Sequence, residues 1–214
     1  MLAKRKAVYY LSGGVAAGFG LLTCFVLLDP LSAMDREFSK EIQEHHNLLL
    51  DQLMRYISWF GYLPGSVIIV AIAATLFFFF GYKKESLFIT LTALSGLLST
   101  LVKLLVNRPR PAAGFVRVIE ITQQQSFPSG HVLFYTTFFG LLTLLMYLLE
   151  EVPATIRIGI GAISLALIFT IPISRIYLGA HWFTDVLAGF LLGILLLIVL
   201  GSVYVSLPKT KSNK

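Results

Sequence analysis

Three short groups of charged and polar residues in this sequence have the types and spacing needed to handle a phosphate group. They occupy positions 103–111, 128–131 and 174–185, and each lies at one end of a long apolar segment. Charged side chains beside a membrane-crossing segment are costly, so they usually have a function. The residue types indicate the chemistry: cations that bind an anion, and histidines that transfer a proton or attack phosphorus.

The cations and one helix start provide the anion-binding part of this chemistry. Lys103, Arg110 and Arg175 can neutralise a phosphoryl dianion, and an arginine offers paired donors that match two phosphate oxygens. Ser129 and Gly130 begin an apolar segment, where the free backbone N–H groups of a helix start attract anions. Glycine also lets the backbone approach such a ligand closely. We therefore expect these five residues to bind phosphate.

Two histidines and one aspartate supply the groups that can break a phosphate ester. His181 and Asp185 are four residues apart, so on a helix they share one face and the carboxylate can orient the imidazole. Such a partner fixes the tautomer and leaves the other ring nitrogen free to attack phosphorus. His131 is placed to donate a proton to the departing alkoxide. We predict that these three residues are catalytic.

Each group also has a structural explanation when it is taken alone. A lysine such as Lys103 can extend from a helix end to the membrane surface, and Arg110 and Arg175 can anchor lipid headgroups. Ser129 can cap an ordinary helix, and a histidine–aspartate pair is often a plain hydrogen bond. The catalytic interpretation is favoured because all of these residues are expected on one side of one bundle.

The composition predicts a membrane protein. Of the 214 residues, 57% are hydrophobic and 13% are charged, which is about half the charged share of an ordinary soluble domain. The net charge is +6, but the lysines and arginines lie between apolar blocks and form no long basic run, so no nucleic-acid partner is expected. Residues 1–214 are predicted to form a single membrane domain that needs the bilayer and no obligate protein partner.

The apolar segments predict an all-α fold, an integral membrane bundle of six transmembrane helices. Crossing a hydrocarbon core takes about 20 helical residues, and each of the six segments is long enough. The first and second polar groups border the same loop, between the third and fourth spans. Two further spans lead to the third group, so all three groups are expected on the same side of the membrane. The predicted spans are residues 7–28, 63–81, 86–106, 130–149, 155–173 and 183–206.

The positions of the lysines and arginines predict the orientation. Both sides of the membrane carry similar numbers of them, but those near the two termini and at 83–84 lie in short segments. The positive-inside rule is strongest for such segments. The sequence therefore predicts cytoplasmic N- and C-termini, with the three polar groups at the outer face of the plasma membrane.

Residues 34–60 differ from the spans because apolar and charged residues alternate there at roughly helical spacing. This pattern predicts an amphipathic surface helix between the first two spans, lying on the outer face of the membrane. It either covers the opening through which a lipid reaches the site or is a passive connector. The pattern alone does not separate these two roles.

The three groups together resemble the three-part signature of the type 2 phosphatidic acid phosphatase superfamily. The motifs match without a departure and in the family's order, and the six-span pattern extends the similarity to nearly the whole chain. Arg108 falls in the variable stretch of the first motif, where a headgroup contact and simple solvation both stay open. The matching residues are Lys103-x6-Arg110-Pro111, Pro128-Ser129-Gly130-His131 and Ser174-Arg175-x5-His181-x3-Asp185.

The resemblance implies a mechanism that agrees with the residue chemistry. In that family the third-motif histidine, here His181, attacks phosphorus and forms a phosphohistidine, and the aspartate, here Asp185, supports it. The second-motif histidine, here His131, protonates the leaving group, and water then hydrolyses the phosphoenzyme. The remaining motif residues would surround the phosphoryl oxygens. The family needs no cofactor or metal, and this sequence has no carboxylate cluster near the site that would bind Mg²⁺.

The expected activity is hydrolysis of a terminal phosphate on a membrane lipid. The resemblance to compact bacterial members favours phosphatidylglycerophosphate, with phosphatidic acid in the same substrate class. Undecaprenyl pyrophosphate is the alternative, because it also presents a terminal phosphoryl group on a membrane-anchored chain. An anion transporter or channel would use the cations, and an inactive lipid-binding protein would use the spans. Neither would need the two histidines and the aspartate.

Overall fold

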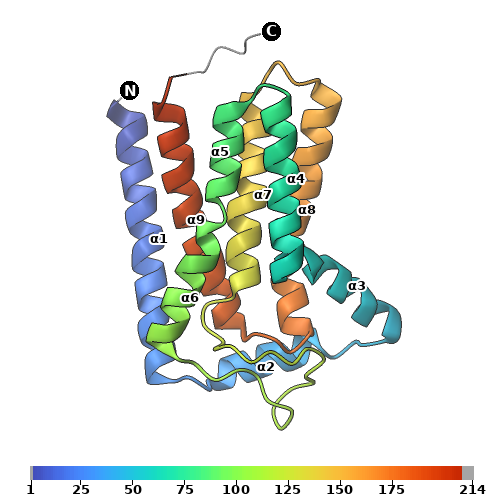
Figure 1. Ribbon diagram of the computed structural model, residues 1–214. Helices are drawn as coiled ribbons and strands as arrows, with labels where there is room; N and C mark the ends of the chain where they lie inside the picture. The colour runs from blue at the N-terminus through green and yellow to red at the C-terminus, as the bar shows by residue number, and fades with distance from the viewer. Residues whose placement is uncertain (1, 209–214) are drawn as a thin grey trace.

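The computed structural model describes residues 2–208, with side chains from Lys6 onward, and this part of the chain contains helices, turns and loops but no strand (Figure 1). The prediction of an all-α fold is confirmed. The helices are α1 (Leu2–Leu28), α2 (Ala33–Ile42), α3 (Leu48–Ser58), the 3₁₀ helix η1 (Trp59–Gly61), α4 (Leu63–Phe79), α5 (Lys83–Leu91), α6 (Leu94–Val106), α7 (Gly130–Leu148), α8 (Ala154–Tyr177) and α9 (Phe183–Ser206).

The described residues contain the candidate membrane spans that the sequence predicts. Five segments are long and apolar enough to cross a bilayer: α1, the α5–α6 pair, α7, α8 and α9. The sixth candidate is a bent pair in which α3 and η1 meet α4 at 59°. One difference from the predicted bounds is in α8, which continues to Tyr177. Arg175 therefore lies in the last turn of a helix.

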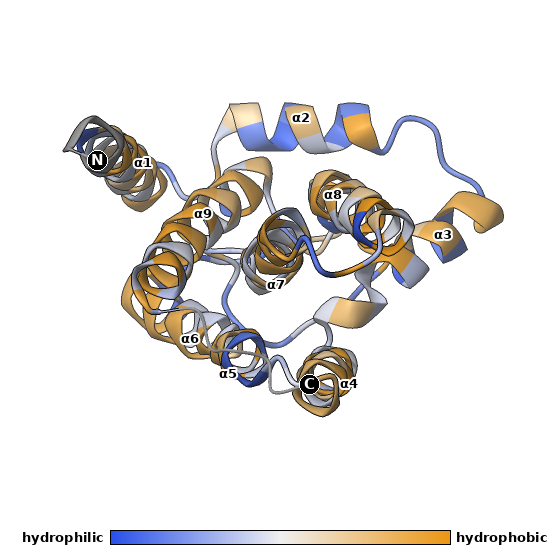
Figure 2. Cartoon of the chain, turned by 90° about the horizontal axis from the view of Figure 1, so that it is seen from above, coloured by the Kyte–Doolittle hydropathy of each residue, from blue (hydrophilic) through white to orange (hydrophobic). Residues whose placement is uncertain are grey.

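Helix α7 lies at the centre of the bundle (Figure 2). Its sequence is apolar on all sides, which suits a helix that is buried on all sides. Two glycines of α9 allow that helix to approach closely. A Cβ atom at Gly189 would lie 2.5 Å from the Ser129 carbonyl oxygen, and one at Gly193 would lie 2.7 Å from Thr136 Cβ. This packing places the start of α9 beside the start of α7, and so the third polar group beside the second.

The third predicted span consists of two helices instead of one continuous helix. α5 ends at Leu91 and α6 begins at Leu94, and between them the Thr92 hydroxyl donates to the Ile89 carbonyl oxygen at 2.6 Å. Threonine hydroxyls that bond to helix carbonyl groups often bend helices. α5 packs mainly against α4, whereas α6 packs mainly against α7 and also contacts α9. The break thus separates α6 from α4, and a cavity lined by both helices lies between them.

The amphipathic segment is present but divided into two helices, α2 and α3. Asn47 begins the second of them, because its side chain accepts a hydrogen bond from the Leu50 N–H at 2.8 Å. The Gln43 amide at the end of α2 donates to the carbonyl oxygens of Arg117 at 2.8 Å and Tyr177 at 2.9 Å. Both helices lie at the end of the bundle that holds the 107–129 loop, opposite the first and last described residues (Figure 1).

Candidate active site

The three polar groups meet at the end of the bundle that carries α2 and α3. Lys103 lies in the last turn of α6, His131 in the first turn of α7, and His181 in the turn between α8 and α9. Ser129 is buried next to Gly130, and Asp185 is buried beside His181. The other six predicted site residues line one cavity of about 720 Å³: Lys103, Arg110, Gly130, His131, Arg175 and His181.

The first motif folds through a left-handed turn at the end of α6. Asn107 has a φ of 48°, and its N–H donates to the Lys103 carbonyl oxygen at 2.9 Å. Asparagine adopts this backbone conformation more readily than most residues. The turn ends the helix and redirects the chain, so that Arg110 lines the same cavity as Lys103.

Backbone carbonyl groups hold both of these cations. Lys103 Nζ donates to the Gln125 carbonyl oxygen at 2.5 Å, and Arg110 donates to those of Gln124 at 2.5 Å and Ala180 at 2.6 Å. Among the side chains that the structure describes, no carboxylate lies within ion-pair distance of either cation. Their positive charges therefore remain available to an anion in the cavity.

The second motif forms the start of α7. The Ser129 N–H donates to the Asp185 carbonyl oxygen at 2.9 Å, which joins this motif to the third. The helix begins at Gly130, where a Cβ atom would lie 3.0 Å from the Ser99 hydroxyl oxygen. The first N–H groups of a helix have no partner within that helix, so this end can bind an anion.

The His131 ring is held by two residues that sequence reasoning did not identify. The Tyr62 ring contacts it edge to face with centroids 4.9 Å apart. A Cβ atom at Gly61 would lie only 2.1 Å from His131 Cδ2, so no side chain fits at that position. Both residues lie at the bend between η1 and α4, and no spacing in the sequence relates them to the motif.

His181 is almost fully buried between the cations and Asp185. Its Nδ1 atom lies 3.6 Å from Asp185 Oδ2, which is within ion-pair range but longer than a hydrogen bond. Arg110 Nη1 lies 3.3 Å from His181 Nε2. Because a guanidinium can only donate, this contact assigns the proton of the neutral ring to Nδ1, on the side of Asp185.

Burial and nearby positive charges lower the pKa of His181 well below its ordinary value. Burial is the largest cause, and the charges of Arg110, Lys103 and Arg175 follow. Burial and Arg175 also lower the pKa of Arg110, to about 10, which leaves the guanidinium charged near neutral pH. The site therefore combines a neutral imidazole with charged neighbours.

Arg175 is held in place by a carboxylate that the sequence did not indicate. Its Nη1 and Nη2 atoms donate to Glu120 at 2.8 and 2.6 Å, and Nη1 also donates to the Ser58 hydroxyl at 3.0 Å. The Tyr62 hydroxyl donates to the same carboxylate at 2.5 Å. Burial alone would raise the pKa of Glu120, but hydrogen bonds from Arg175 and its charge hold that pKa below the ordinary value.

Several buried polar atoms around the cavity have no hydrogen-bond partner within the described chain. In proteins more than about 90% of such groups have one, so these atoms indicate a ligand with several polar atoms. Among residues 2–208, no group of three or more His, Cys, Asp or Glu side chains could hold a metal ion. The unpartnered atoms are Arg175 Nε, Ser129 Oγ, His131 Nε2, Ser95 Oγ, Ser99 Oγ and Thr122 Oγ1.

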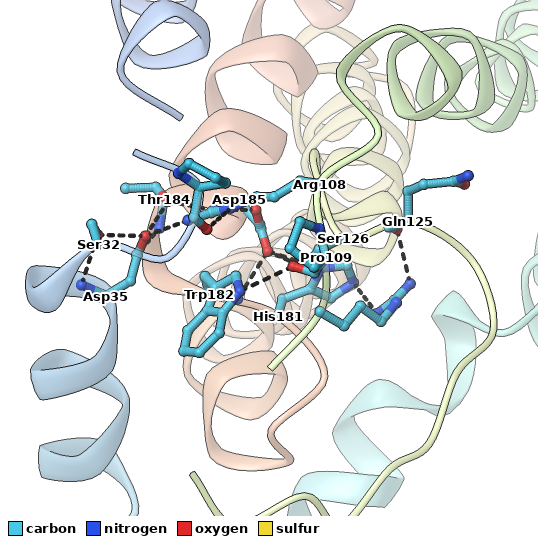
Figure 3. A network of polar contacts seen from close by, with 12 residues as sticks. Ser32, Asp35, Arg108, Pro109, Gln125, Ser126, His181, Trp182, Thr184 and Asp185 are labelled. Atoms are coloured by element: carbon cyan, nitrogen blue, oxygen red, sulfur yellow. Dashed lines mark hydrogen bonds and ion pairs between the residues drawn. The ribbon is translucent and has the colours of Figure 1, made fainter. Parts of the chain in front are cut away.

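Arg108 does not face lipid headgroups or solvent, which were the two roles considered for it. The residue is 1% exposed, and its guanidinium bonds to Asp35 of α2 and to Asp185 (Figure 3). Burial of this arginine could not be read from the motif, because its partner Asp35 lies on a distant surface helix. Arg108 is not among the residues that line the cavity.

Comparisons with known proteins identify the family and the fold. A family model described as the PAP2 superfamily matches residues 84–207. Phosphatidylglycerophosphatase B of Bacillus subtilis (strain 168) is 28% identical over 188 residues, which cover 83% of this chain and 87% of the relative. A crystal structure of a transmembrane PAP2 type phosphatidylglycerolphosphate phosphatase from Bacillus subtilis has a TM-score of 0.83 at 22% identity, covering 94% of this chain and all of that one (100%). The crystal structure of Aquifex aeolicus LpxE has a TM-score of 0.61 at 25% identity, covering 84% and 99%.

Proposed function

The chain belongs to the PAP2 superfamily of metal-independent phosphatases, and we propose that it hydrolyses phosphatidylglycerophosphate to phosphatidylglycerol through a phosphohistidine on His181. As a member of that family it is a multi-pass integral membrane lipid phosphate phosphatase. One observation carries the proposal: a neutral, buried imidazole lies in a cavity beside Lys103 and Arg110, which no described carboxylate neutralises.

In the first chemical step, His181 Nε2 attacks phosphorus. This nitrogen is the one that lies 3.3 Å from Arg110 Nη1, so it faces the cations, while Nδ1 keeps its proton beside Asp185. The new N–P bond forms as the bond from phosphorus to the lipid oxygen breaks, and His131 gives a proton to that oxygen. Water then attacks phosphorus and gives a proton to His131. The N–P bond breaks, and inorganic phosphate is released.

The surrounding donors bind the phosphoryl oxygens and stabilise the charge that builds up on them. Lys103 and Arg110 supply cationic donors, and Arg175 supplies an N–H at Nε that has no other partner in the described chain. Ser129 and the N–H groups at the start of α7, next to Gly130, complete the set of donors. Such preorganised donors are usually the largest single contribution to phosphoryl transfer.

The shape of the cavity supports a lipid substrate of the glycerophospholipid class. From the cations the cavity extends between α4 and α6, where Val67, Val70 and Leu97 give it an apolar lining. The buried, unpartnered hydroxyls of Ser95 and Ser99 also line it. Hydroxyls there can donate to the ester carbonyl groups of a glycerophospholipid. Beyond its two phosphates, undecaprenyl pyrophosphate has no comparable acceptor, so it is the less favoured substrate.

We also propose that the site faces the outer side of the plasma membrane, with both termini in the cytoplasm. The site lies at the end of the bundle opposite the first and last described residues (Figure 1). A Gln123→Cys variant tests this orientation in a Cys24→Ala background, because Gln123 is exposed in the loop beside the site. A membrane-impermeant maleimide should label it in intact cells. Labelling only after lysis would show that the site faces the cytoplasm.

The proposed activity is tested by phosphate release from purified protein in detergent with excess chelator. Phosphatidylglycerophosphate, phosphatidic acid and undecaprenyl pyrophosphate are compared in parallel, beside the His181→Ala variant. We expect metal-independent release that is fastest from phosphatidylglycerophosphate and lost in the variant. Faster release from undecaprenyl pyrophosphate would make that lipid, and not phosphatidylglycerophosphate, the preferred substrate. Release that persists in the variant would contradict the phosphohistidine mechanism.

A second comparison tests the contribution of the cavity hydroxyls to substrate choice. Ser95→Ala should lower the rate on ester-linked phosphatidic acid towards the rate on its ether-linked analogue, which lacks the carbonyl acceptors. Ser202→Ala is the matched control, because Ser202 is exposed on α9. A soluble ester such as phenyl phosphate should be hydrolysed equally by all three proteins.

A further inference from the structure

A fully buried arginine lies between two fully buried carboxylates directly behind the cavity. Arg108 Nη1 donates to Asp185 Oδ1 at 2.5 Å, and Nη2 donates to Asp35 Oδ2 at 2.6 Å. All three side chains have an exposed fraction of 0%. The third guanidinium nitrogen, Nε, donates to the Pro30 carbonyl oxygen at 2.9 Å. An arginine held this completely is not available to a ligand, so its role must be performed through its partners.

Asp35 connects the surface helix α2 to the first turn of α9. Its Oδ1 accepts from the Thr184 N–H at 2.9 Å, and its Oδ2 accepts from the Thr184 hydroxyl at 2.7 Å (Figure 3). The Ser32 hydroxyl, at the start of α2, also donates to Oδ2 at 3.0 Å. The Thr184 hydroxyl lies 2.7 Å from Arg108 Nη1. Because Thr184 is adjacent to Asp185, the bonds to Thr184 restrain the aspartate that faces His181.

Asp185 is oriented by donors from three separate segments. Arg108 bonds to Oδ1, while the Trp182 N–H at 2.9 Å and the Ser126 hydroxyl bond to Oδ2. Oδ2 is also the oxygen that lies 3.6 Å from His181 Nδ1. With both oxygens held, the carboxylate cannot rotate away from the imidazole. The proton on Nδ1 therefore keeps a fixed acceptor nearby.

The charges of the three residues explain why a second carboxylate is needed. When His181 attacks phosphorus, positive charge develops on its ring, and a nearby negative charge stabilises it. Arg108 alone would neutralise Asp185 and remove most of that effect. Asp35 balances the charge of Arg108, so the group of three keeps one net negative charge on the side of His181. Each carboxylate bonds to Arg108, so neither is buried without a partner of opposite charge.

We infer that Asp35 and Arg108 are positioning residues for phosphoryl transfer: they hold Asp185 against His181 and keep a net negative charge beside the ring. The inference rests on the proposed function of His181 and adds two residues to its site. It also assigns a role to α2, which supplies Asp35. α2 then is a fixed part of the catalytic end of the bundle and not a moving cover.

The chain offers a matched control for Asp35 in Asp51 of α3. Asp51 also bonds an arginine of the 107–129 loop with both oxygens, at 2.9 and 2.6 Å from Arg117, and accepts from the Tyr177 hydroxyl at 2.7 Å. Asp51 is not among the residues that line the cavity or contact His181 and Asp185. Asp35→Asn and Asp51→Asn therefore remove the same charge from two surface helices, and only the first lies behind the site.

The test measures kcat, KM and the inhibition constant of inorganic phosphate for both variants on phosphatidylglycerophosphate. We expect Asp35→Asn to lower kcat about 10- to 100-fold, the size of effect that small displacements of catalytic groups produce, with phosphate inhibition within about threefold of wild type. Asp51→Asn should keep kcat within about twofold of wild type. Arg108→Lys should resemble Asp35→Asn, because an ammonium keeps the charge but cannot bridge two carboxylates with a planar fork. Equal kcat values for Asp35→Asn and Asp51→Asn would overturn the inference.

A milder variant decides the question if Asp35→Asn does not fold. Thr184→Val removes the hydroxyl shared by Arg108 and Asp35 without changing any charge, and a lowered kcat with unchanged phosphate inhibition is expected. An unchanged kcat in that variant would also overturn the inference. His181→Ala is measured alongside. If it stays active, the proposed mechanism itself fails. If it is inactive while Asp35→Asn is normal, only the positioning role fails.

Discussion

Arg108 and Arg110 are separated by one proline, yet they belong to two regions with opposite electrostatics. Arg108 lies in what we call the paired centre, defined as Asp35, Arg108 and Asp185, where carboxylates balance its charge. Arg110 lies in the open cluster, defined as Lys103, Arg110 and His181. Within residues 6–208, the polar groups that contact these cations are carbonyl oxygens and an imidazole. The partner of a buried cation thus decides whether the cation orders the protein or binds a ligand.

Arg175 combines the two behaviours within one side chain. Glu120 holds both terminal nitrogens, as in the paired centre, while Nε has no partner in the described chain and the residue lines the cavity, as in the open cluster. A carboxylate can therefore fix a guanidinium without removing it from the site, provided that it leaves one donor free.

The largest expected effect comes from the only proposed nucleophile in the open cluster. His181→Ala should lower kcat by at least about 10⁴-fold, because the loss of a nucleophile removes the covalent pathway. Phosphate release from phosphatidylglycerophosphate measures this, and the melting temperature checks the fold. His45→Ala is the control, since His45 is an exposed histidine outside the cavity. Comparable losses in both variants would mean that the site has been misidentified.

Replacing the two neighbouring arginines should separate the regions. Arg110→Met should lower kcat/KM by about 10²- to 10³-fold with little change in melting temperature, because it removes a donor to the transition state. Arg108→Met should lower kcat through Asp185, and it should also lower the free energy of unfolding by about 3–5 kcal/mol, because it leaves Asp35 and Asp185 as unpaired buried carboxylates. Kinetics and thermal unfolding of both variants check this. If both variants lost activity at unchanged stability, the distinction between the regions would be wrong.

A smaller effect is expected at Glu120, which positions Arg175. Glu120→Gln keeps the shape of the side chain but weakens the two bonds to the guanidinium, so kcat/KM should fall by about 10-fold. Glu41→Gln is the control, because Glu41 is exposed on α2. Unchanged kcat/KM in Glu120→Gln would show that the carboxylate does not set the geometry of Arg175.

The smallest expected effect is a change in pH dependence. Burial and the charges of Arg110, Lys103 and Arg175 lower the pKa of His181, while the Asp185 carboxylate faces the opposite side of its ring. The ring therefore stays neutral and able to attack below the usual histidine pKa of about 6.5. Lys103→Met removes one charge and raises the pKa of His181. The acid limb of the pH profile of kcat/KM, measured on the residual activity of Lys103→Met, should then move to higher pH. A limb that moves to lower pH would contradict this account.

Much of the site follows from local features of the sequence. Long apolar runs form helices wherever they cross a bilayer, because every backbone group must be satisfied within the span. Counting those runs was enough to bring Lys103, His131 and His181 to one end of the bundle. The extent of a single domain over residues 1–214 and the catalytic roles of these residues stay predictions.

Other features could not be predicted because they depend on contacts between distant segments. The break at Thr92 lies inside an apolar run that looks continuous, yet it opens the cavity between α4 and α6. Gly61 and Tyr62 contact His131 only because the bend before α4 places them beside α7. No period or motif in the sequence reports such contacts.

By itself, the sequence determined the apolar spans and the types of group that gather at the site, since these depend on hydropathy, length and residue chemistry. Only the tertiary structure decided which charges are free. Arg108 and Arg110 have the same side chain and nearly the same neighbours in sequence, but one meets Asp35 and Asp185 and the other meets carbonyl oxygens. The energy of a buried charge depends on the groups packed around it in space, and those groups come from helices far apart in the chain.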